Sequence, residues 1–274
     1  MSNGIITLYT RNILEDGTVD VTGTADTGYP ESRLYDRSSS MYWKYTTGAT
    51  KIDQFGFGED DFGFGGDRFG FEYEEQQDII IHCAQSSAIR PVDLLFIAGH
   101  NFDGRTILWQ YSVDGGVTWS AAATWAQSGN GDIVKSLASA ITARDWRVVV
   151  GMHVNPIAGE CIMSQGRSFQ ALGNPTPSEQ PTGNVIWSRS IGGLERSIKL
   201  GSKKMGWNME LRFNGDADLQ DFRAAMDDLS DYSLPLLLKD INDEYYIMRL
   251  LSEPVINHSP PLRYYTTLTA REAE

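Results

Sequence analysis

Hydrophobic and polar positions alternate with a period of two over much of this chain, which predicts a protein built mainly from β-strands. The clearest apolar or alternating stretches are Ile5–Tyr9, Ile79–Ile81, Asp93–Ala98, Thr106–Val113, Trp146–Val150 and Tyr245–Leu251. The strictest alternation is the set Trp207, Met209, Leu211 and Phe213. Because every second side chain shares one face of a strand, we expect this strand to bury that face.

One segment departs from the alternation and predicts a helix. Its apolar residues are spaced by three or four positions: Leu219, Phe222, Met226, Leu229 and Tyr232. Asp218 can cap its start, and Pro235 follows its end. We therefore expect one helix over about residues 218–232, packed on the strand that carries Trp207.

Proline and glycine content suggests a domain boundary. Residues 171–185 (ALGNPTPSEQPTGNV) carry three prolines and two glycines. We expect this linker to separate a sandwich over residues 1–170 from a second domain over residues 186–274. The predicted fold class is mainly β, with an N-terminal jelly-roll-like β-sandwich and a C-terminal β-sandwich or barrel that has one α-helix.

A phenylalanine-glycine repeat with a period of seven lies within an acidic insertion, residues 52–78. The repeat reads FGFGEDD, FGFGGDR, FGFEYEE, and the insertion holds nine acidic residues and one basic residue. Glycine at this density is incompatible with a stable helix. We interpret the repeat as a docking loop; the alternatives are a hairpin that covers the sandwich and a calcium loop, although Asp60, Asp61 and Asp67 lack the alternating spacing of known calcium loops. The candidate interface residues are Phe55, Phe57, Phe62, Phe64, Phe69 and Phe71.

Composition narrows the class of partner. The formal net charge of −13 disfavours nucleic acid, since phosphate binding needs clustered lysine and arginine. The two cysteines, Cys83 and Cys161, have apolar neighbours and are expected to be buried thiols. The first residues lack the pattern of a signal peptide, and no apolar run reaches the roughly 20 residues of a membrane span.

Catalytic and cofactor motifs are missing from the sequence. The four histidines, His82, His100, His153 and His258, have no metal-ligand spacing, and there is no P-loop, GxSxG or CxxC motif. No two acidic residues close together in the sequence form a recognisable glycosidase pair. We therefore expect a protein without catalytic activity, metal or cofactor.

Residues 94–120, LLFIAGHNFDGRTILWQYSVDGGVTWS, resemble the jelly-roll sandwich of discoidin and galactose-binding-like modules. The resemblance covers about residues 78–150, and Leu34, Asp36 and Trp43 add a weaker match. It implies binding through aromatic residues on loops. The candidates are Tyr29, Tyr42, Trp43, Trp119 and Trp125, most of which we expect to lie in the core.

The C-terminal ninety residues resemble the tail-tube, distal-tail and baseplate-hub families of tailed phages. The segments that carry the resemblance are GLERSIKLGSKKMGWNMELRF, LQDFRAAMDDLSDY and PLLLKDINDEYYIMRLLSEP. It implies a distal tail or minor tail protein that forms a ring, with six copies as the expected number. The implied location is the virion, assembled in the host cytoplasm, and the implied partners are tail tube, hub and fibre proteins and host surface carbohydrate.

Charge is segregated within this second domain. Residues 185–212 hold six basic and two acidic residues, whereas residues 214–233 hold six acidic residues and one basic residue. Head-to-tail docking around a ring would use Arg196, Lys199, Lys203 and Lys204 against Asp221, Asp227, Asp228 and Asp231. The alternative is salt bridging within one copy.

Two functions therefore remain open from the sequence. The first is a structural component of a phage tail tip or baseplate, which forms a ring through its C-terminal domain and docks proteins or host glycan through its N-terminal domain. The alternative is a soluble carbohydrate-binding protein, or an accessory module of an enzyme that acts on polysaccharides.

Overall fold

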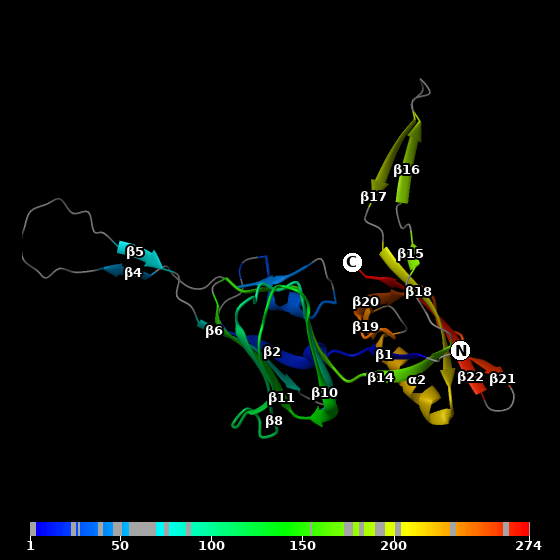
Figure 1. The fold of residues 1–274 in the computed structure, drawn as a ribbon, viewed down its shortest axis with the longest axis horizontal. Helices are drawn as coiled ribbons and strands as arrows, with labels where there is room; N and C mark the ends of the chain where they lie inside the picture. The colour runs from blue at the N-terminus through cyan, green and yellow to red at the C-terminus, as the bar shows by residue number, and fades with distance from the viewer. Residues whose placement is uncertain are drawn as a thin grey trace, which may run out of the picture. The chain divides into compact units, whose positions relative to one another are not determined.

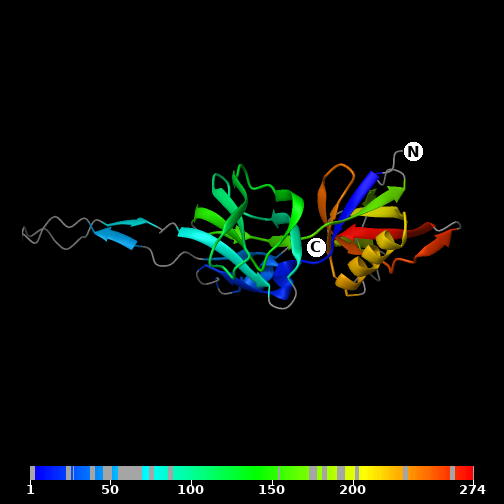
Figure 2. The same cartoon turned by 90° about the horizontal axis from the view of Figure 1, so that it is seen from below.

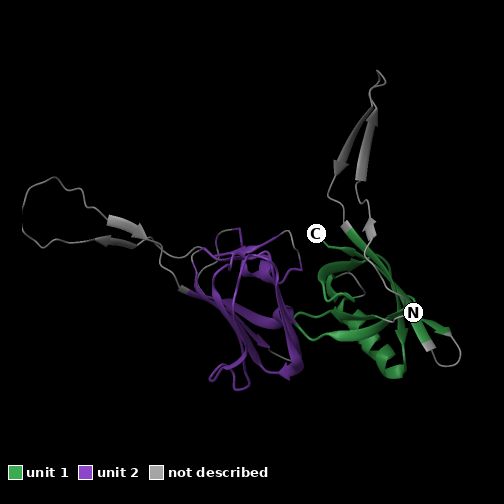
Figure 3. Ribbon diagram, in the orientation of Figure 1, with its two compact units in different colours: residues 1–12, 164–274 green, residues 13–163 purple. Residues whose placement is uncertain are grey.

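Strand pairing divides the chain into two units, residues 13–163 and residues 1–12 with 164–274 (Figure 3). The computed structural model describes residues 4–22, 26, 28–37, 41–45, 51–54, 70–73, 77–85, 89–153, 155–172, 178–180, 184–189, 195–200, 204–230, 234–259 and 263–273. For residues 51–54, 70–73, 77, 178–180, 184–189, 195–200, 204, 259 and 263 it describes the backbone alone.

The unit of residues 13–163 contains a five-stranded and a three-stranded sheet (Figure 1). The five strands, in spatial order, are β2 (Gly17–Val21), β6 (Gln77–Gln85), β11 (Asp145–His153), β8 (Thr106–Ser112) and β9 (Ser120–Ala126). The three-stranded sheet is β10 (Ile133–Thr142), β7 (Pro91–Ala98) and β13 (Glu160–Ser164). Smaller elements are α1 (Ile13–Asp16), the 3-10 helix η1 (Glu31–Leu34), the pair β3 (Trp43–Lys44) and β12 (Ile157–Ala158), and the pair β4 (Lys51–Gln54) and β5 (Gly70–Tyr73).

Apolar residues of both sheets form one core in this unit, as the alternating pattern predicts. Trp109 and Trp146, on neighbouring strands, are fully buried, and their ring centroids lie 5.3 Å apart. Cys83 and Cys161 belong to the same core and are not disulfide-bonded, which confirms the expectation of buried thiols. Burial raises the pKa of the Cys83 thiol to about 12, so this thiol is not a reactive nucleophile.

The second unit contains a closed β-barrel. Its ring runs β18 (Lys204–Phe213), β14 (Arg167–Leu172), β1 (Gly4–Tyr9), β19 (Leu236–Lys239), β20 (Tyr245–Leu250) and β22 (Arg263–Glu272), and β22 pairs back to β18. The strands β15 (Ser178–Gln180) and β21 (Asn257–Ser259) extend this sheet, and β16 (Asn184–Arg189) pairs with β17 (Glu195–Leu200). The mainly β fold class, with sandwich and barrel, is confirmed.

The helix of this unit, α2 (Asp216–Asp228), packs its apolar face onto the barrel core (Figure 2). Phe222 is buried, and its ring lies 5.0 Å from Phe213 of β18 and 5.6 Å from Phe169 of β14. The alternating set on β18, Trp207 to Phe213, is buried as predicted. The helix begins two residues before the predicted start and ends at Asp228, and Asp218 lies in its first turn rather than at the cap.

The predicted domain boundary is wrong, because the sandwich is inserted into the barrel. Strand β1 pairs with β14, from Gly4 opposite Ala171 to Leu8 opposite Arg167. Residues 13–163 therefore occupy the position of a turn between two neighbouring antiparallel strands. Sequence periodicity identifies β1 as a strand, but it cannot identify a partner so distant along the chain. The expected linker 171–185 lies within the barrel unit and overlaps β14 and β15.

Candidate functional site

The structure separates the five aromatic residues proposed as sugar contacts. Trp43 is 1% exposed and belongs to the core. Trp125 is half-buried against the core, and the Lys135 ammonium lies 4.8 Å from its ring centroid. Tyr29, Tyr42 and Trp119 remain, and they fall into two separate groups.

Tyr29 and Tyr42 form the first group, which we call the tyrosine platform. Their rings stack with centroids 4.9 Å apart and an interplanar angle of 25°. Tyr42 precedes β3 and is 37% exposed, whereas Tyr29, just before η1, is half-buried. Stacking on Tyr29 holds the Tyr42 ring in a defined orientation on the surface.

Charged groups surround the tyrosine platform. The Arg33 guanidinium and the Lys44 ammonium lie 5.5 Å and 5.9 Å from the Tyr29 ring centroid. Lys44 also pairs with Asp26 at 3.5 Å. The neighbouring Tyr29 hydroxyl raises the pKa of Tyr42, so the Tyr42 hydroxyl is neutral at physiological pH. An exposed ring bordered by donors and an acceptor suits a ligand with both apolar and hydroxyl-bearing faces.

The second group includes Trp119 and lies on the outer face of the five-stranded sheet. The Cα register aligns Asp20, His82, Arg147, Gln110 and Ala121 across strands β2, β6, β11, β8 and β9. We call these five residues the cross-sheet row. Their side chains point away from the core, since Trp146 and Val148, on either side of Arg147, are buried.

Within the cross-sheet row, Arg147 is fixed by two contacts. Its Nε donates to Oε1 of Gln110 at 2.8 Å, and its Cζ lies 4.0 Å from the centroid of the Trp119 ring. His82 meets the same ring edge-on at 5.7 Å, and its Nε2 lies 3.3 Å from Oδ1 of Asp145. Burial lowers the pKa of the Arg147 guanidinium, which still carries its charge at neutral pH.

The DGG turn between β8 and β9 positions Trp119. Gly115 and Gly116 adopt φ of 77° and 84°, a conformation that favours glycine. Asp114 accepts hydrogen bonds from the Ser112 hydroxyl, the Thr118 hydroxyl and the Thr118 backbone. These bonds hold the pKa of Asp114 well below its usual range. The motif seen in the sequence is therefore a structural turn that leads directly into the indole.

The predicted docking residues are only partly described. Phe55, Phe57, Phe62, Phe64, Phe69, Lys203 and Asp231 lie outside the described residues, and for Phe71, Arg196, Lys199 and Lys204 only the backbone is described. Of the acidic insertion, residues 52–78, the structure describes the backbone of the paired strands β4 and β5 and the start of β6 at Gln77 and Asp78. Asp221 and Asp227 are exposed on α2, as an interface would require.

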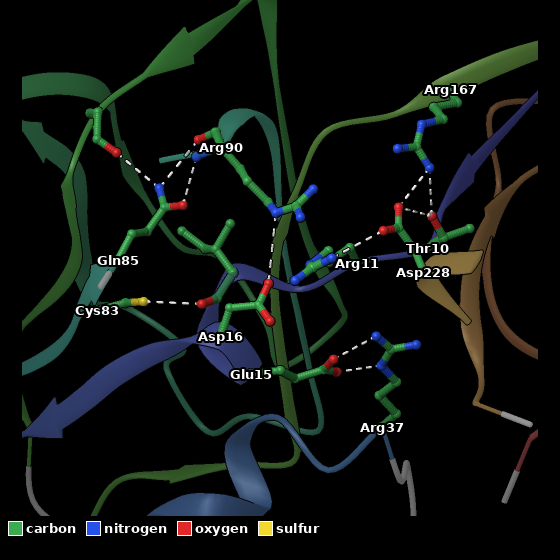
Figure 4. Close-up of polar contacts among 12 residues, drawn as sticks. Thr10, Arg11, Glu15, Asp16, Arg37, Cys83, Gln85, Arg90, Arg167 and Asp228 are labelled. Carbon is green, nitrogen blue, oxygen red and sulfur yellow. Dashed lines mark hydrogen bonds and ion pairs between the residues drawn. The ribbon is translucent and has the colours of Figure 1, made fainter. Parts of the chain in front are cut away.

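Asp228 does not belong with these exposed acids. Its side chain is 10% exposed and accepts from Nη1 of Arg167 at 2.7 Å and Nη1 of Arg11 at 3.2 Å (Figure 4). The Thr10 hydroxyl lies 3.4 Å from the same carboxylate. Asp228 is therefore paired within the barrel unit itself, with two arginines that lie outside the basic segment 185–212.

A buried acid lies in β13 of the sandwich. Glu160 is fully buried, and its carboxyl oxygens have no hydrogen-bond partner in the described part of the chain. Burial, followed by the charges of Asp36 and Glu15, raises the pKa of Glu160 well above its usual value, although Arg37 opposes the shift. Arg37 itself is paired with Glu15, with Nη2 to Oε2 at 2.6 Å (Figure 4).

The remaining candidate chemistry is structural. His100 bonds to the Gly131 carbonyl oxygen at 2.8 Å and His153 to that of Asn101 at 2.8 Å, so both buried rings brace loops. Among the described residues, no cluster of three or more His, Cys, Asp or Glu side chains could hold a metal ion. No helix in the described part is long and apolar enough to cross a membrane.

Comparison with known proteins gives no match to a family model and none to a curated protein. Among solved structures, a GH29 fucosidase of Ruminococcus gnavus in complex with fucose is 14% identical, with a TM-score of 0.42 over 58% of this chain and 28% of that one. Chitosan-binding module 1 of a Paenibacillus chitosanase/glucanase is 17% identical, with a TM-score of 0.40 over 57% of this chain and 99% of the module.

A family 32 carbohydrate-binding module of C. perfringens NanJ, in complex with galactose, is 11% identical, with a TM-score of 0.39 over 58% of this chain and 99% of the module. The match therefore spans only about 28% of the fucosidase but nearly all of the two binding modules. All three TM-scores are below 0.5, so the fold assignment rests on the strand pairing described above.

Proposed function

We propose that residues 13–163 form a carbohydrate-binding module and that the protein acts by binding rather than by catalysis. The observation that carries this proposal is the tyrosine platform. One face of the Tyr42 ring is backed by Tyr29, and Arg33, Lys44 and Asp26 supply polar groups nearby. The C–H face of a sugar stacks on such a ring while its hydroxyls meet the charged groups.

The proposal is tested by titrating the intact chain with galactose, fucose and chitotriose in a calorimeter. Tyr42→Ala should abolish binding, whereas Tyr42→Phe should preserve most of it because the ring face is retained. Ile89→Ala is the matched control, because it removes another exposed apolar side chain from the same unit. Sugar binding that is unchanged in Tyr42→Ala would refute the platform as the site.

The second candidate function is a structural part of a phage tail, in which the barrel unit joins copies into a ring. The feature that favours it is the exposed acidic surface of α2 at Asp221 and Asp227. Its proposed partners are further copies of the chain, six being the expected number, and neighbouring tube, hub and fibre proteins. Sedimentation of the purified chain tests it: a discrete closed oligomer supports a ring, and a monomer at all concentrations argues against self-assembly.

A further inference from the structure

We propose that Arg147 and Gln110 of the cross-sheet row form, together with Trp119, a second binding site, which takes the carboxylate of an acidic sugar such as a uronic acid. The proposal deepens the carbohydrate-binding function above, but it rests on different residues. The site is centred on Arg147, with Trp119 beneath the guanidinium and Gln110 at its side.

Arg147 has no carboxylate partner among the described residues, in contrast to four arginines that are paired. Arg11 and Arg167 pair with Asp228, Arg37 pairs with Glu15, and Arg90 lies 3.8 Å from Asp16. The Arg147 side chain forms no ion pair within the described part of the chain, and its one hydrogen bond to a described residue is the Nε bond to Gln110. A partly desolvated cation without a counterion is a natural position for an anionic ligand.

The geometry of Arg147 also selects the shape of the anion. The Trp119 ring restricts the guanidinium from one side, with Cζ 4.0 Å from the ring centroid, and the Nε bond to Gln110 restricts its rotation. The two terminal nitrogens are then presented as a fixed fork. Such a fork binds the two oxygens of a planar carboxylate with parallel hydrogen bonds, and little side-chain freedom is lost on binding.

Neighbouring charges define the side from which an anion can approach. Asp145 is 5% exposed and is engaged by His82, and Asp20 lies opposite His82 at the β2 edge. Asp145 lies two residues before Arg147 on β11 and reaches towards β6 through its contact with His82, so the two carboxylates together make the β6 and β2 side of Arg147 unfavourable to an anion. On the opposite side the row continues through the neutral Gln110 to the small, exposed Ala121. A carboxylate is therefore expected over β8 and β9.

Hydroxyl recognition completes the argument for a sugar acid. The Gln110 amide can donate to a hydroxyl while its oxygen holds Arg147. The exposed part of Trp119 provides an apolar surface beside these polar groups. A uronic acid offers a carboxylate, several hydroxyls and an apolar C–H face in one ring, which matches all three elements.

The experiment compares galacturonate with galactose, which differ at one carbon, by calorimetric titration of the intact chain. Galacturonate should bind more tightly. Arg147→Met should weaken galacturonate binding by about tenfold or more, as expected for loss of hydrogen bonds to a charged group. Arg147→Lys should also weaken it, because the charge remains but the fork is lost. Arg144→Met is the control, because it removes an exposed arginine near the same turn, and it should leave affinity unchanged.

Several outcomes would overturn the site. The first is equal affinity for galacturonate and galactose. The second is an Arg144→Met variant that loses as much galacturonate affinity as Arg147→Met. The third is an Arg147 variant that retains the native circular dichroism and binds galacturonate as tightly as the unaltered protein. Tighter Arg147-dependent binding of a poly-glutamate peptide than of galacturonate would replace the sugar with an acidic protein partner. Tyr42→Ala should leave galacturonate binding intact, so failure of the tyrosine platform and failure of this site are distinguishable.

Discussion

Arg167, the first residue of β14, donates a 2.7 Å hydrogen bond to Asp228, the last residue of α2. Arg11, from the segment that leaves β1, contacts the same carboxylate at 3.2 Å. The Asp228 side chain thus contacts both the chain segment that leads into the inserted sandwich and the segment that leads out of it. A carboxylate at a helix C-terminus is unfavourable for the helix dipole, and the two guanidinium groups offset that cost.

Asp228→Asn should therefore destabilise the barrel unit. Loss of charge-assisted hydrogen bonds in a mostly buried position is expected to cost about 1.5–3 kcal/mol. Chemical denaturation followed by circular dichroism measures the loss. Asp227→Asn, at the exposed neighbouring position, is the control and should change stability little. Equal stability of the two variants would mean that the network contributes nothing.

Phe222 should be critical to the same unit because its ring contacts Phe169 and Phe213 in the core. Phe222→Ala is expected to reduce the free energy of unfolding by about 3–5 kcal/mol. Arg223→Ala changes the next, exposed residue of the helix and serves as the control. A melting temperature unchanged in Phe222→Ala would contradict the packing of α2.

The barrel unit should fold without the sandwich. Tyr9 lies beside Leu8, which pairs with Arg167, so replacing residues 10–165 with Asn-Gly would leave an ordinary two-residue hairpin. The buried residues of the barrel core all lie in residues 1–9 and 166–274, so the shortened chain retains that core. A cooperative thermal transition is expected, and a chain that binds hydrophobic dyes without such a transition would argue against independence.

Stability should depend on pH through Glu160. Burial raises its pKa in the folded state above the ordinary value of 4.5, so between the two pKa values the folded protein binds more protons than the unfolded chain. The free energy of unfolding should therefore fall as pH rises from about 4.5 through the raised pKa. Urea denaturation across pH 5–8 should show a flatter profile for Glu160→Gln.

The control for this profile is Glu253→Gln, which changes an exposed carboxylate. It should reproduce the slope of the unaltered protein. A Glu160→Gln profile with the same slope would show that another group is responsible for the pH dependence.

Local patterns predicted local structure well. The alternation from Trp207 to Phe213 identified both a strand and its buried face, and the spacing of Leu219 and Phe222 identified the helix and its apolar side. The DGG motif likewise marked a turn, because its glycines adopt the positive φ that the turn requires. In each case the physical cause lies within a few residues.

The features that the sequence did not reveal depend on distant partners. Nothing near Ile5–Tyr9 indicates that this strand pairs with β14 and β19 rather than with the sandwich. The segregation of charge suggested that the acids of α2 face the basic segment, yet Asp228 pairs with Arg11 and Arg167, which lie outside it. Arg147 and His82 were missed for the same reason, since only strand register brings them beside Trp119.

The insertion of the sandwich between β1 and β14 also fixes an order of events during synthesis. Strand β1 leaves the ribosome before the sandwich, but its partner strands begin only at Arg167 and Leu236. The sandwich can fold before β14 and β19 have been synthesised, and during that time both edges of β1 are unpaired. Ribosome-bound chains truncated before Arg167 should therefore carry a folded sandwich and an aggregation-prone N-terminal strand, which makes this strand a natural client for a chaperone.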